Sequence, residues 1–181
     1  MSFEAMGVTI VRIRYLITFA CYGTHLHGEE RGAVDRHHRI PGTPLARPSQ
    51  ARGSIEAQQM AQAPYALDEP RREAVLHSII EVCAHNNWTL LAAHVRTNHV
   101  HVVVEAEYSP ERAMSTLKAY ASRKLNELGL DEPDRKRWAR HGSTRWLWNP
   151  STLSAAIEYV VREQGPPLSV FEARSRILAL P

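Results

Sequence analysis

The chain has few of the features that mark secreted or membrane-bound proteins. It contains two cysteines, Cys21 and Cys83, and no apolar stretch that approaches the ~18 residues of a membrane-spanning helix. No signal-like apolar run is present either. We therefore expect a soluble, cytoplasmic protein with reduced thiols, whose fold does not depend on disulfides.

Net charge is also low, at +3, and the hydrophobic fraction of 44% is ordinary for a globular protein. A length of 181 residues suits one domain with its own core. We predict a single domain over 1–181 with a long loop insertion at about 21–68. Prolines and glycines recur in that insertion, and it has no clear periodicity.

Hydrophobic periodicity predicts four strands and three helices outside the loop. The order is β-α-β-β-α-β followed by a helix, which is the ferredoxin-like arrangement. The predicted class is therefore α+β, with one antiparallel sheet, helices on one face, and an additional C-terminal helix. The expected strands cover 8–20, 88–95, 99–106 and 144–148, and the expected helices cover 68–85, 109–128 and 149–164.

A pattern typical of a metal site opens the strand expected over 99–106. Strand side chains alternate between faces, so His99 and His101 project the same way, at a separation that one cation can bridge. The alternative is a pair of structural or exposed histidines. His25 and His27 show how weak the bare pattern is, because they lie in a glycine-flanked segment typical of a turn.

The last helix carries a tyrosine away from its apolar stripe. At ~100° per residue, Tyr159 lies roughly 130° from the centre of that stripe, so it is poorly placed for the core. Glu163, four residues later, lies on the same side of the helix. A hydroxyl nucleophile and an oxygen ligand could thus face one target; the alternative is an exposed tyrosine beside the stripe.

Positive charge is concentrated between Arg135 and Trp146. This segment holds five Lys or Arg residues, no acids and two tryptophans. Cations provide phosphate contacts and aromatic rings provide stacking surfaces, as in single-stranded nucleic-acid binding. A solvated basic loop with buried tryptophans is the alternative.

Taken together, these motifs resemble the HUH single-tyrosine transposases, in particular the REP-associated tyrosine transposase branch. The resemblance extends from about Tyr15 to Gln164, without the long loop. The segment Tyr22–Gly28 also looks like one common in that branch. The resemblance is carried mainly by four segments, which are Asn98–His101, Lys118–Asn126, Gly142–Trp148 and Glu158–Val160.

The resemblance implies that His99 and His101 hold Mg²⁺ or Mn²⁺ and that Tyr159 is the nucleophile. Relatives often place a Gln or Asn four residues after the tyrosine as a third ligand. Here that position is Glu163, with Gln164 as the alternative. The segment Arg96–Thr97 departs from the Met-Pro usual in the family, and we expect this to alter the turn rather than the metal.

The implied activity is that of a single-stranded DNA endonuclease and strand transferase, which forms a 5′-phosphotyrosine at hairpin-associated sites. Single-stranded DNA with hairpin structure is the implied partner, and both a monomer and a homodimer are compatible with the family. The candidates for DNA contacts are Lys118, Arg123, Lys124, Arg135, Lys136, Arg137, Arg145 and Trp138.

Trp146 and Trp148 could stack bases, but we expect them in the core. Two other functions compete with transposition. One is a non-catalytic ferredoxin-like nucleic-acid-binding protein, and the other is a zinc hydrolase. The zinc hydrolase is disfavoured because no Glu or third His lies at familiar zinc-enzyme spacing beside the pair.

Overall fold

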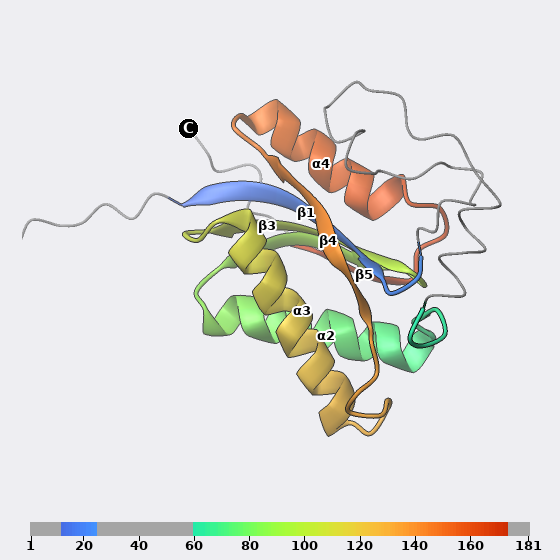
Figure 1. Ribbon diagram of the computed structural model, residues 1–181. Helices are drawn as coiled ribbons and strands as arrows, with labels where there is room; N and C mark the ends of the chain where they lie inside the picture. The colour runs from blue at the N-terminus through green and yellow to red at the C-terminus, as the bar shows by residue number, and fades with distance from the viewer. Residues whose placement is uncertain (1–11, 25–59, 174–181) are drawn as a thin grey trace, which may run out of the picture.

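The computed structural model describes residues 12–24 and 60–173. These form one antiparallel sheet of five strands in the order β4-β1-β3-β2-β5, with three helices (Figure 1). Residues 8–11 of the first predicted strand, His25, His27 and most of the predicted loop lie outside the described residues. The elements are β1 (Ile13–Cys21), α2 (Glu69–His85), β2 (Thr89–Val95), β3 (His99–Ala106), α3 (Pro110–Glu127), β4 (Trp138–Trp146), α4 (Pro150–Arg162) and β5 (Ser169–Glu172).

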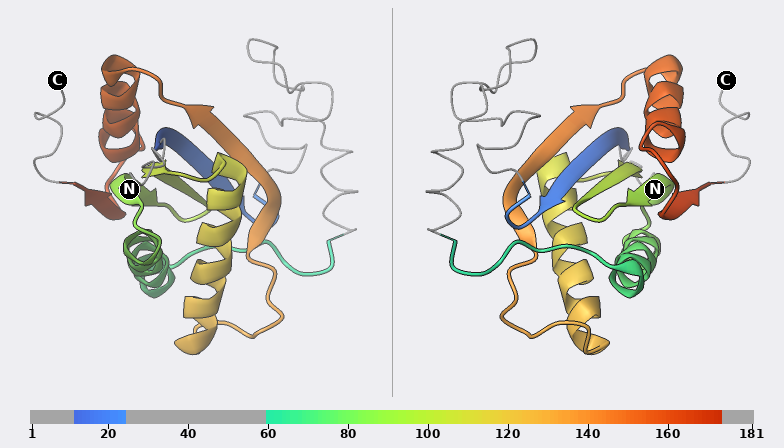
Figure 2. Two further views of the ribbon diagram at one scale, coloured as in Figure 1. Left: turned by 90° about the vertical axis from the view of Figure 1, so that its left-hand side faces the viewer. Right: turned by 90° about the vertical axis from the view of Figure 1, so that its right-hand side faces the viewer.

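The first four strands have the ferredoxin-like order β4-β1-β3-β2, so the predicted fold class is confirmed. Helices α2 and α3 lie together on one face of the sheet (Figure 2). Helix α4 covers the opposite face, where it packs against β2 and β3. The sheet is thus enclosed by helices on both sides, and the two faces have different contents.

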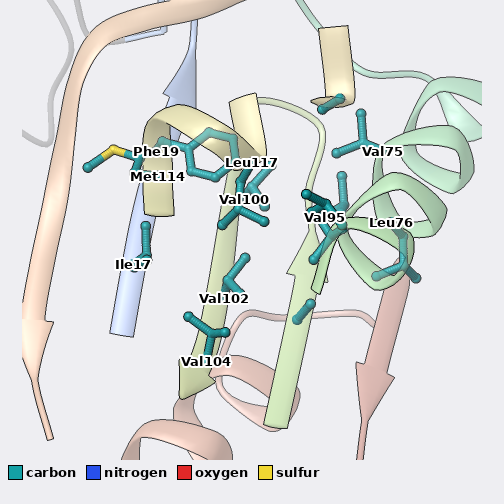
Figure 3. Close-up of a cluster of buried hydrophobic side chains, with 14 of the residues drawn as sticks. Ile17, Phe19, Val75, Leu76, Val95, Val100, Val102, Val104, Met114 and Leu117 are labelled. Atoms are coloured by element: carbon teal, nitrogen blue, oxygen red, sulfur yellow. The ribbon is translucent and has the colours of Figure 1, made fainter. Parts of the chain in front are cut away.

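The larger core lies between the sheet and the helix pair α2 and α3. Alternate residues of β1 and β3, such as Ile17, Phe19 and Val102, point toward it and are fully or almost fully buried (Figure 3). Leu117 of α3 fills the space above them. Both helices begin at side-chain caps: Asp68 accepts from the Arg71 amide, and Ser109 accepts from the Arg112 amide. This face holds the fold together.

A smaller apolar cluster lies under α4. It joins Val103 of β3 to Leu153, Ile157 and Val160 of the helix. Because helices cover both faces, β2 and β3 are buried almost throughout, which explains their nearly continuous apolar sequences. The helix begins with a reciprocal capping pair in which the Asn149 side chain accepts from the Thr152 amide.

Two strands differ from the sequence prediction. β4 begins at Trp138 rather than at 144, so much of the predicted basic loop is an edge strand. Gly142 permits a close approach there, because a Cβ atom at this position would lie 2.5 Å from the Thr18 carbonyl oxygen. β5 was not predicted, since four residues after Gly165-Pro166-Pro167 give no periodic signal. Within the described ranges, no helix combines the length and apolarity needed to cross a membrane.

Candidate active site

The two histidines lie on the face of β3 that points toward α4. His99 and His101 alternate with the buried valines of the opposite face, as the strand period requires. Their ring centroids are 4.7 Å apart. A tight hairpin precedes them, in which the Arg96 amide donates to the His99 carbonyl at 2.8 Å. The predicted pairing of the two side chains on one side of a rigid strand is therefore present in the fold.

His101 is held from the neighbouring strand. Its Nδ1 shares a hydrogen bond of 2.8 Å with the Thr18 hydroxyl, and Thr18 is its direct cross-strand partner. The other nitrogen, Nε2, is buried and has no hydrogen-bond partner among the described residues. When Nδ1 donates to Thr18, the lone pair lies on Nε2, which is the arrangement of a metal-binding imidazole with a second hydrogen bond that orients it.

Electrostatics keep His101 neutral. Burial and the nearby His99 and His94 together lower the pKa of His101 to about 3, and the Gln164 side chain opposes this shift. Only a neutral imidazole can donate a lone pair to a metal. His99 is also oriented through Nδ1, which lies 2.7 Å from the Asn98 side-chain oxygen. Because an amide oxygen only accepts, this contact assigns the proton to Nδ1.

Tyr159 faces the histidines from α4. Its ring centroid lies 5.5 Å from that of His101, with the planes at 80°. The side chain remains 39% exposed, whereas Ile157 and Val160 of the same helix are buried. The amphipathic stripe therefore rotates the tyrosine toward the edge of the site, as its angular position in the sequence predicted. Tyr159 and His101 therefore meet within one chain.

The end of α4 separates the two candidates for a third ligand. The helix ends at Arg162, so Glu163 is its C-cap and its side chain is exposed. In the described part of the chain, no group of three His, Cys, Asp or Glu side chains lies close enough to share a metal ion. Glu163 thus does not join the histidines in this structure. Gln164 instead donates to the Tyr159 carbonyl at 3.1 Å and lies close enough to His101 to raise the pKa of that imidazole.

Sequence reasoning missed His94, which couples the strands to the tyrosine helix. His94 is fully buried and pairs directly with His101 across the hairpin. Its Nε2 accepts from the Leu168 amide at 3.3 Å, so its Nδ1 donates to the Val160 carbonyl at 2.9 Å. The short hairpin fixes this register, and its loop length in the sequence could have placed His94 opposite His101.

Arg96 anchors the segment after α4. Its guanidinium donates to the Pro166 carbonyl at 2.7 Å, close to Gly165, whose positive φ of 79° turns the chain. The arginine that departs from the usual Met-Pro pattern thus supports the end of the tyrosine helix. This departure affects the turn and its neighbours.

A cavity of about 710 Å³ opens between α4 and the strands β1, β3 and β4. His101 and Tyr159 line it together with Thr18. Ser143 and Arg145 of β4 form its far wall. Arg145 is exposed and makes no ion pair with any described residue. The cavity thus combines a tyrosine side chain, a neutral imidazole and an exposed guanidinium.

Several of the predicted DNA contacts are structural instead. Arg137 is buried, with 5% exposure, and pairs with the Asp131 carboxylate at 2.8 Å. Asp131 also accepts from Tyr65 and Arg71. The prediction that Arg137 contacts DNA is therefore wrong, because its charge is needed inside the domain. The basic composition of the segment hid this, since buried and exposed arginines look alike in sequence.

Other members of the predicted set also have partners. Lys118 donates to the carbonyls of Ala139 and His141, so it fastens α3 to β4. Lys124 pairs with Glu81 at 2.8 Å. Arg135 donates to Gln62, Ala63 and Pro64. Arg123 stacks on Tyr120, and Lys136 lies over Tyr22. Of the predicted cations, Arg145 is the one that lines the cavity.

The exposure of the tryptophans differs from the sequence prediction, because Trp138 is the most buried of the three around β4. Trp138 is half-buried against Phe19, and its indole N–H donates to Lys118 and Ser122, so it contributes to the packing of α3 against β4. Trp146 and Trp148 are 40% and 73% exposed. The expectation that these two belong to the core is wrong.

Comparison with known proteins identifies the family. The family described as "Transposase IS200 like" matches residues 63–159, which is more than half of the chain and includes His99, His101 and Tyr159. The chain therefore belongs to the IS200-like transposases. The predicted membership of the single-tyrosine HUH transposases is confirmed.

Two solved structures are similar to this chain. One is a REP-associated tyrosine transposase bound to a REP hairpin, with 12% identity over 87% of this chain and 70% of that one, at a TM-score of 0.44. The other is a candidate transposase from Deinococcus radiodurans R1, with 12% identity over 91% of this chain and 98% of that one, at a TM-score of 0.43. No curated protein matches the chain.

Proposed function

We propose that this transposase cleaves and rejoins single-stranded DNA through a covalent link to Tyr159, with a divalent ion held by His99 and His101. The observation that carries the proposal is the approach of Tyr159 to His101 in one chain, with 5.5 Å between ring centroids at a shared cavity. A phosphodiester in that cavity would lie against both side chains.

The residues fit a metal site. Among the described residues, the buried Nε2 of His101 has no hydrogen-bond partner, and both imidazoles are oriented through Nδ1. Neutral imidazoles suit several divalent ions, and an amide oxygen from Gln164 would add the hard ligand that Mg²⁺ and Mn²⁺ prefer. The chemistry supplied by the bound ion is neutralisation of charge on the scissile phosphate. We assign the third ligand to Gln164 rather than Glu163.

Tyr159 supplies the nucleophile. Its oxygen forms a bond to phosphorus as the bond from phosphorus to the 3′-oxygen breaks, and the phenolic proton is released to solvent while the leaving 3′-oxygen gains one. The products are a 5′-phosphotyrosine and a free 3′-hydroxyl. Because the link retains the phosphodiester energy, attack by another 3′-hydroxyl rejoins strands. Arg145 and Ser143 would hold the phosphate in the cavity. Hairpins near the cleavage site are the DNA structures that we expect it to recognise.

The direct test is trapping of the covalent intermediate. Hairpin-bearing single-stranded DNA, labelled at its 3′ end, is incubated with the full chain and Mn²⁺, and adducts are resolved on a denaturing gel. The 3′ label is required because the protein becomes attached to the 5′ phosphate of the downstream fragment. We expect an adduct with the unmodified chain and none with Tyr159→Phe.

The matched control is Tyr120→Phe, on α3 at the opposite face of the sheet, which should leave the adduct unchanged. An adduct that persists in Tyr159→Phe would falsify the proposed nucleophile. Binding of DNA with no adduct in any protein would support the non-catalytic alternative. Tightly bound zinc without DNA cleavage would indicate the hydrolase.

A further inference from the structure

The most exposed aromatic surface in the described residues is a pair of stacked indoles. The rings of Trp146 and Trp148 lie 5.0 Å apart with an angle of 10° between their planes. Trp146 rests edge-on against Tyr15 at 5.0 Å, so the stack begins at the core and ends at solvent. The outer ring, Trp148, is 73% exposed. A stack that ends in an open indole face can accept one more planar group.

The backbone holds this pair rigidly. Leu147, between the two tryptophans, points to the other side and is buried in the cluster under α4. Its amide donates to the Arg14 carbonyl at 2.9 Å. Asn149, the next residue after the pair, is the N-cap of α4. Trp148 is therefore fixed between a buried leucine and a helix cap, which lowers the entropy cost of binding a ligand on its face.

Packing of the domain accounts for Trp146, which contacts Tyr15, but not for Trp148. The core ends at Tyr15, and a smaller apolar residue at 148 would leave less apolar surface in water. The contacts of Arg71 and Arg137 with Asp131 lie at the loop that follows α3 and do not involve either indole. The outer face of the Trp148 ring is thus without a packing partner among the described residues, although large aromatic side chains usually find one.

The location relates the pair to the cavity. β4 is an edge strand of the described sheet, and Arg145, which lines the cavity, immediately precedes Trp146. Trp146 pairs with Tyr15 and therefore faces the α2 and α3 side of the sheet, whereas Thr18 and Arg145 face the cavity on the α4 side. Along β1, Tyr15 lies three positions from Thr18, the partner of His101, which corresponds to roughly 10 Å of strand. A strand of DNA with one phosphate beside Tyr159 could cross the edge of β4, contact the Arg145 guanidinium and reach the indoles.

We propose that Trp146 and Trp148 form a stacking platform for an unpaired base of the DNA, across the β4 edge from the cavity that receives the scissile phosphate. An unpaired nucleobase is the planar group that the chemistry favours, because the neighbouring free cation matches a phosphate and every base has a face that stacks on an indole. The proposal rests on the proposed function for the identity of its ligand as single-stranded DNA.

The test compares a strand with bases to one without them. Full-length protein carrying Tyr159→Phe, so that cleavage cannot occur, is titrated with a 20-nucleotide oligodeoxyadenylate and with an abasic strand of the same length. Trp148→Ala should weaken binding of the oligodeoxyadenylate by about fivefold to a hundredfold, the range of single base–aromatic stacks. Affinity for the abasic strand should stay the same.

Three further variants sharpen the result. Trp148→Tyr keeps an aromatic face and should restore most of the affinity, whereas Trp148→Leu keeps apolar volume alone and should behave like Trp148→Ala. Leu128→Ala, a similarly exposed apolar residue at the end of α3, should change neither affinity. A thermal melt of each variant verifies folding.

Equal effects of Trp148→Ala on both strands, or no effect on either, would overturn the platform. So would a change confined to self-association in sedimentation, which would indicate that the indoles contact a second copy of the chain. Failure of the proposed function is distinguishable, since it appears as the absence of a covalent adduct in the unmodified chain. Loss of base-dependent affinity without an adduct would retain the platform and reject the nucleophile.

Discussion

The two faces of the sheet use the same strands for different purposes. On the face covered by α2 and α3, alternate side chains of β1 and β3 are apolar and interlock with the helices. On the face covered by α4, the intervening positions include Thr18, His99 and His101, and a cavity remains. The first face has the close packing that stabilises the domain, and the second leaves a cavity lined by His101, whose Nε2 has no hydrogen-bond partner among the described residues. Stability and reactivity are thus separated by the two-residue period of a strand.

The same separation applies to charge. At the loop that follows α3, Arg137 and Arg71 both form ion pairs with the Asp131 carboxylate. On the α4 face, Arg145 is exposed at the cavity and has no ion-pair partner among the described residues. Arginines a few positions apart in one basic segment therefore have opposite roles. Burial and pairing, rather than the number of cations, decide which of them can meet a phosphate.

The largest expected effect comes from removing His101, the proposed metal ligand on the α4 face. His101→Ala should reduce Mn²⁺-dependent cleavage by more than about a hundredfold, beyond what loss of an outer-shell partner causes. Stability should change far less, because the lost ring makes one side-chain hydrogen bond and borders a cavity. Cleavage rates and thermal melts of the same samples measure the two quantities. Parental cleavage by the variant contradicts a ligand role.

The opposite face should respond in the opposite way. Leu117→Ala removes a fully buried side chain of α3 and should destabilise the domain by about 2–5 kcal/mol. The fraction that remains folded should cleave DNA at the parental rate. Urea unfolding gives the stability, and Leu128→Ala, at a position 57% exposed, serves as the control with little effect. A cleavage defect in fully folded Leu117→Ala would show that the faces are coupled.

His94 lies where the hairpin meets α4, so its replacement should affect both quantities moderately. His94→Ala leaves the Val160 carbonyl and the Leu168 amide without their partner, at a cost of about 1–3 kcal/mol. Cleavage should fall because Tyr159 adjoins Val160. His94→Gln can both donate and accept and should recover part of each loss. Equal cleavage by the Ala and Gln variants at matched folding would argue against a positioning role.

A smaller effect on cleavage is expected at the end of α4, where replacement of Gln164 can be compared directly with replacement of Glu163. Gln164→Ala should weaken Mn²⁺ activation of cleavage by about tenfold or more, whereas Glu163→Ala should leave it unchanged. The physical reason is position, since Gln164 interacts with His101 and Glu163 is exposed. Titration of cleavage with Mn²⁺ measures the apparent metal affinity of each variant. The reverse order would restore Glu163 as the ligand.

The smallest expected effect is a pH dependence of the folding stability, which arises from Asp131 in the loop that follows α3. Burial alone would raise the pKa of Asp131, but hydrogen bonds from Tyr65, Arg137 and Arg71 outweigh it and hold the pKa below the ordinary value of 3.8. Because its pKa is lower in the folded state, the Asp131 carboxylate stabilises the fold at any pH above its pKa in the unfolded chain. This stabilisation is lost as the pH falls through its pKa in the folded protein. Unfolding between pH 6 and pH 2 should therefore show an acid-side loss of stability.

Asp131→Asn should remove part of that acid-side dependence while lowering stability at neutral pH. Asp134→Asn, at an exposed position nearby, is the matched control and should keep the parental profile. Identical pH profiles for the parent and Asp131→Asn would contradict the assigned network.

Much of the fold followed from local patterns. The caps Asp68 and Ser109 and the apolar run after His101 predicted their elements closely, because these signals act within a few residues. β4 and β5 were less predictable. Charged residues and Gly142 mask the strand character of β4, and its start is fixed by pairing of Trp138 with Cys21, more than a hundred positions away in sequence. Such pairings leave no local trace.

For the site, the sequence by itself determined the chemical groups: two histidines on one side of a strand, and a tyrosine turned away from the apolar stripe of the last helix. Alternation and helical periodicity require that much in any fold that retains these elements. The tertiary structure alone decided that His101 faces Tyr159, that Gln164 rather than Glu163 lies beside it, and that Trp148 is open to solvent while Arg137 is buried. These outcomes depend on which elements pack together, and packing brings distant residues together in ways that no local pattern records.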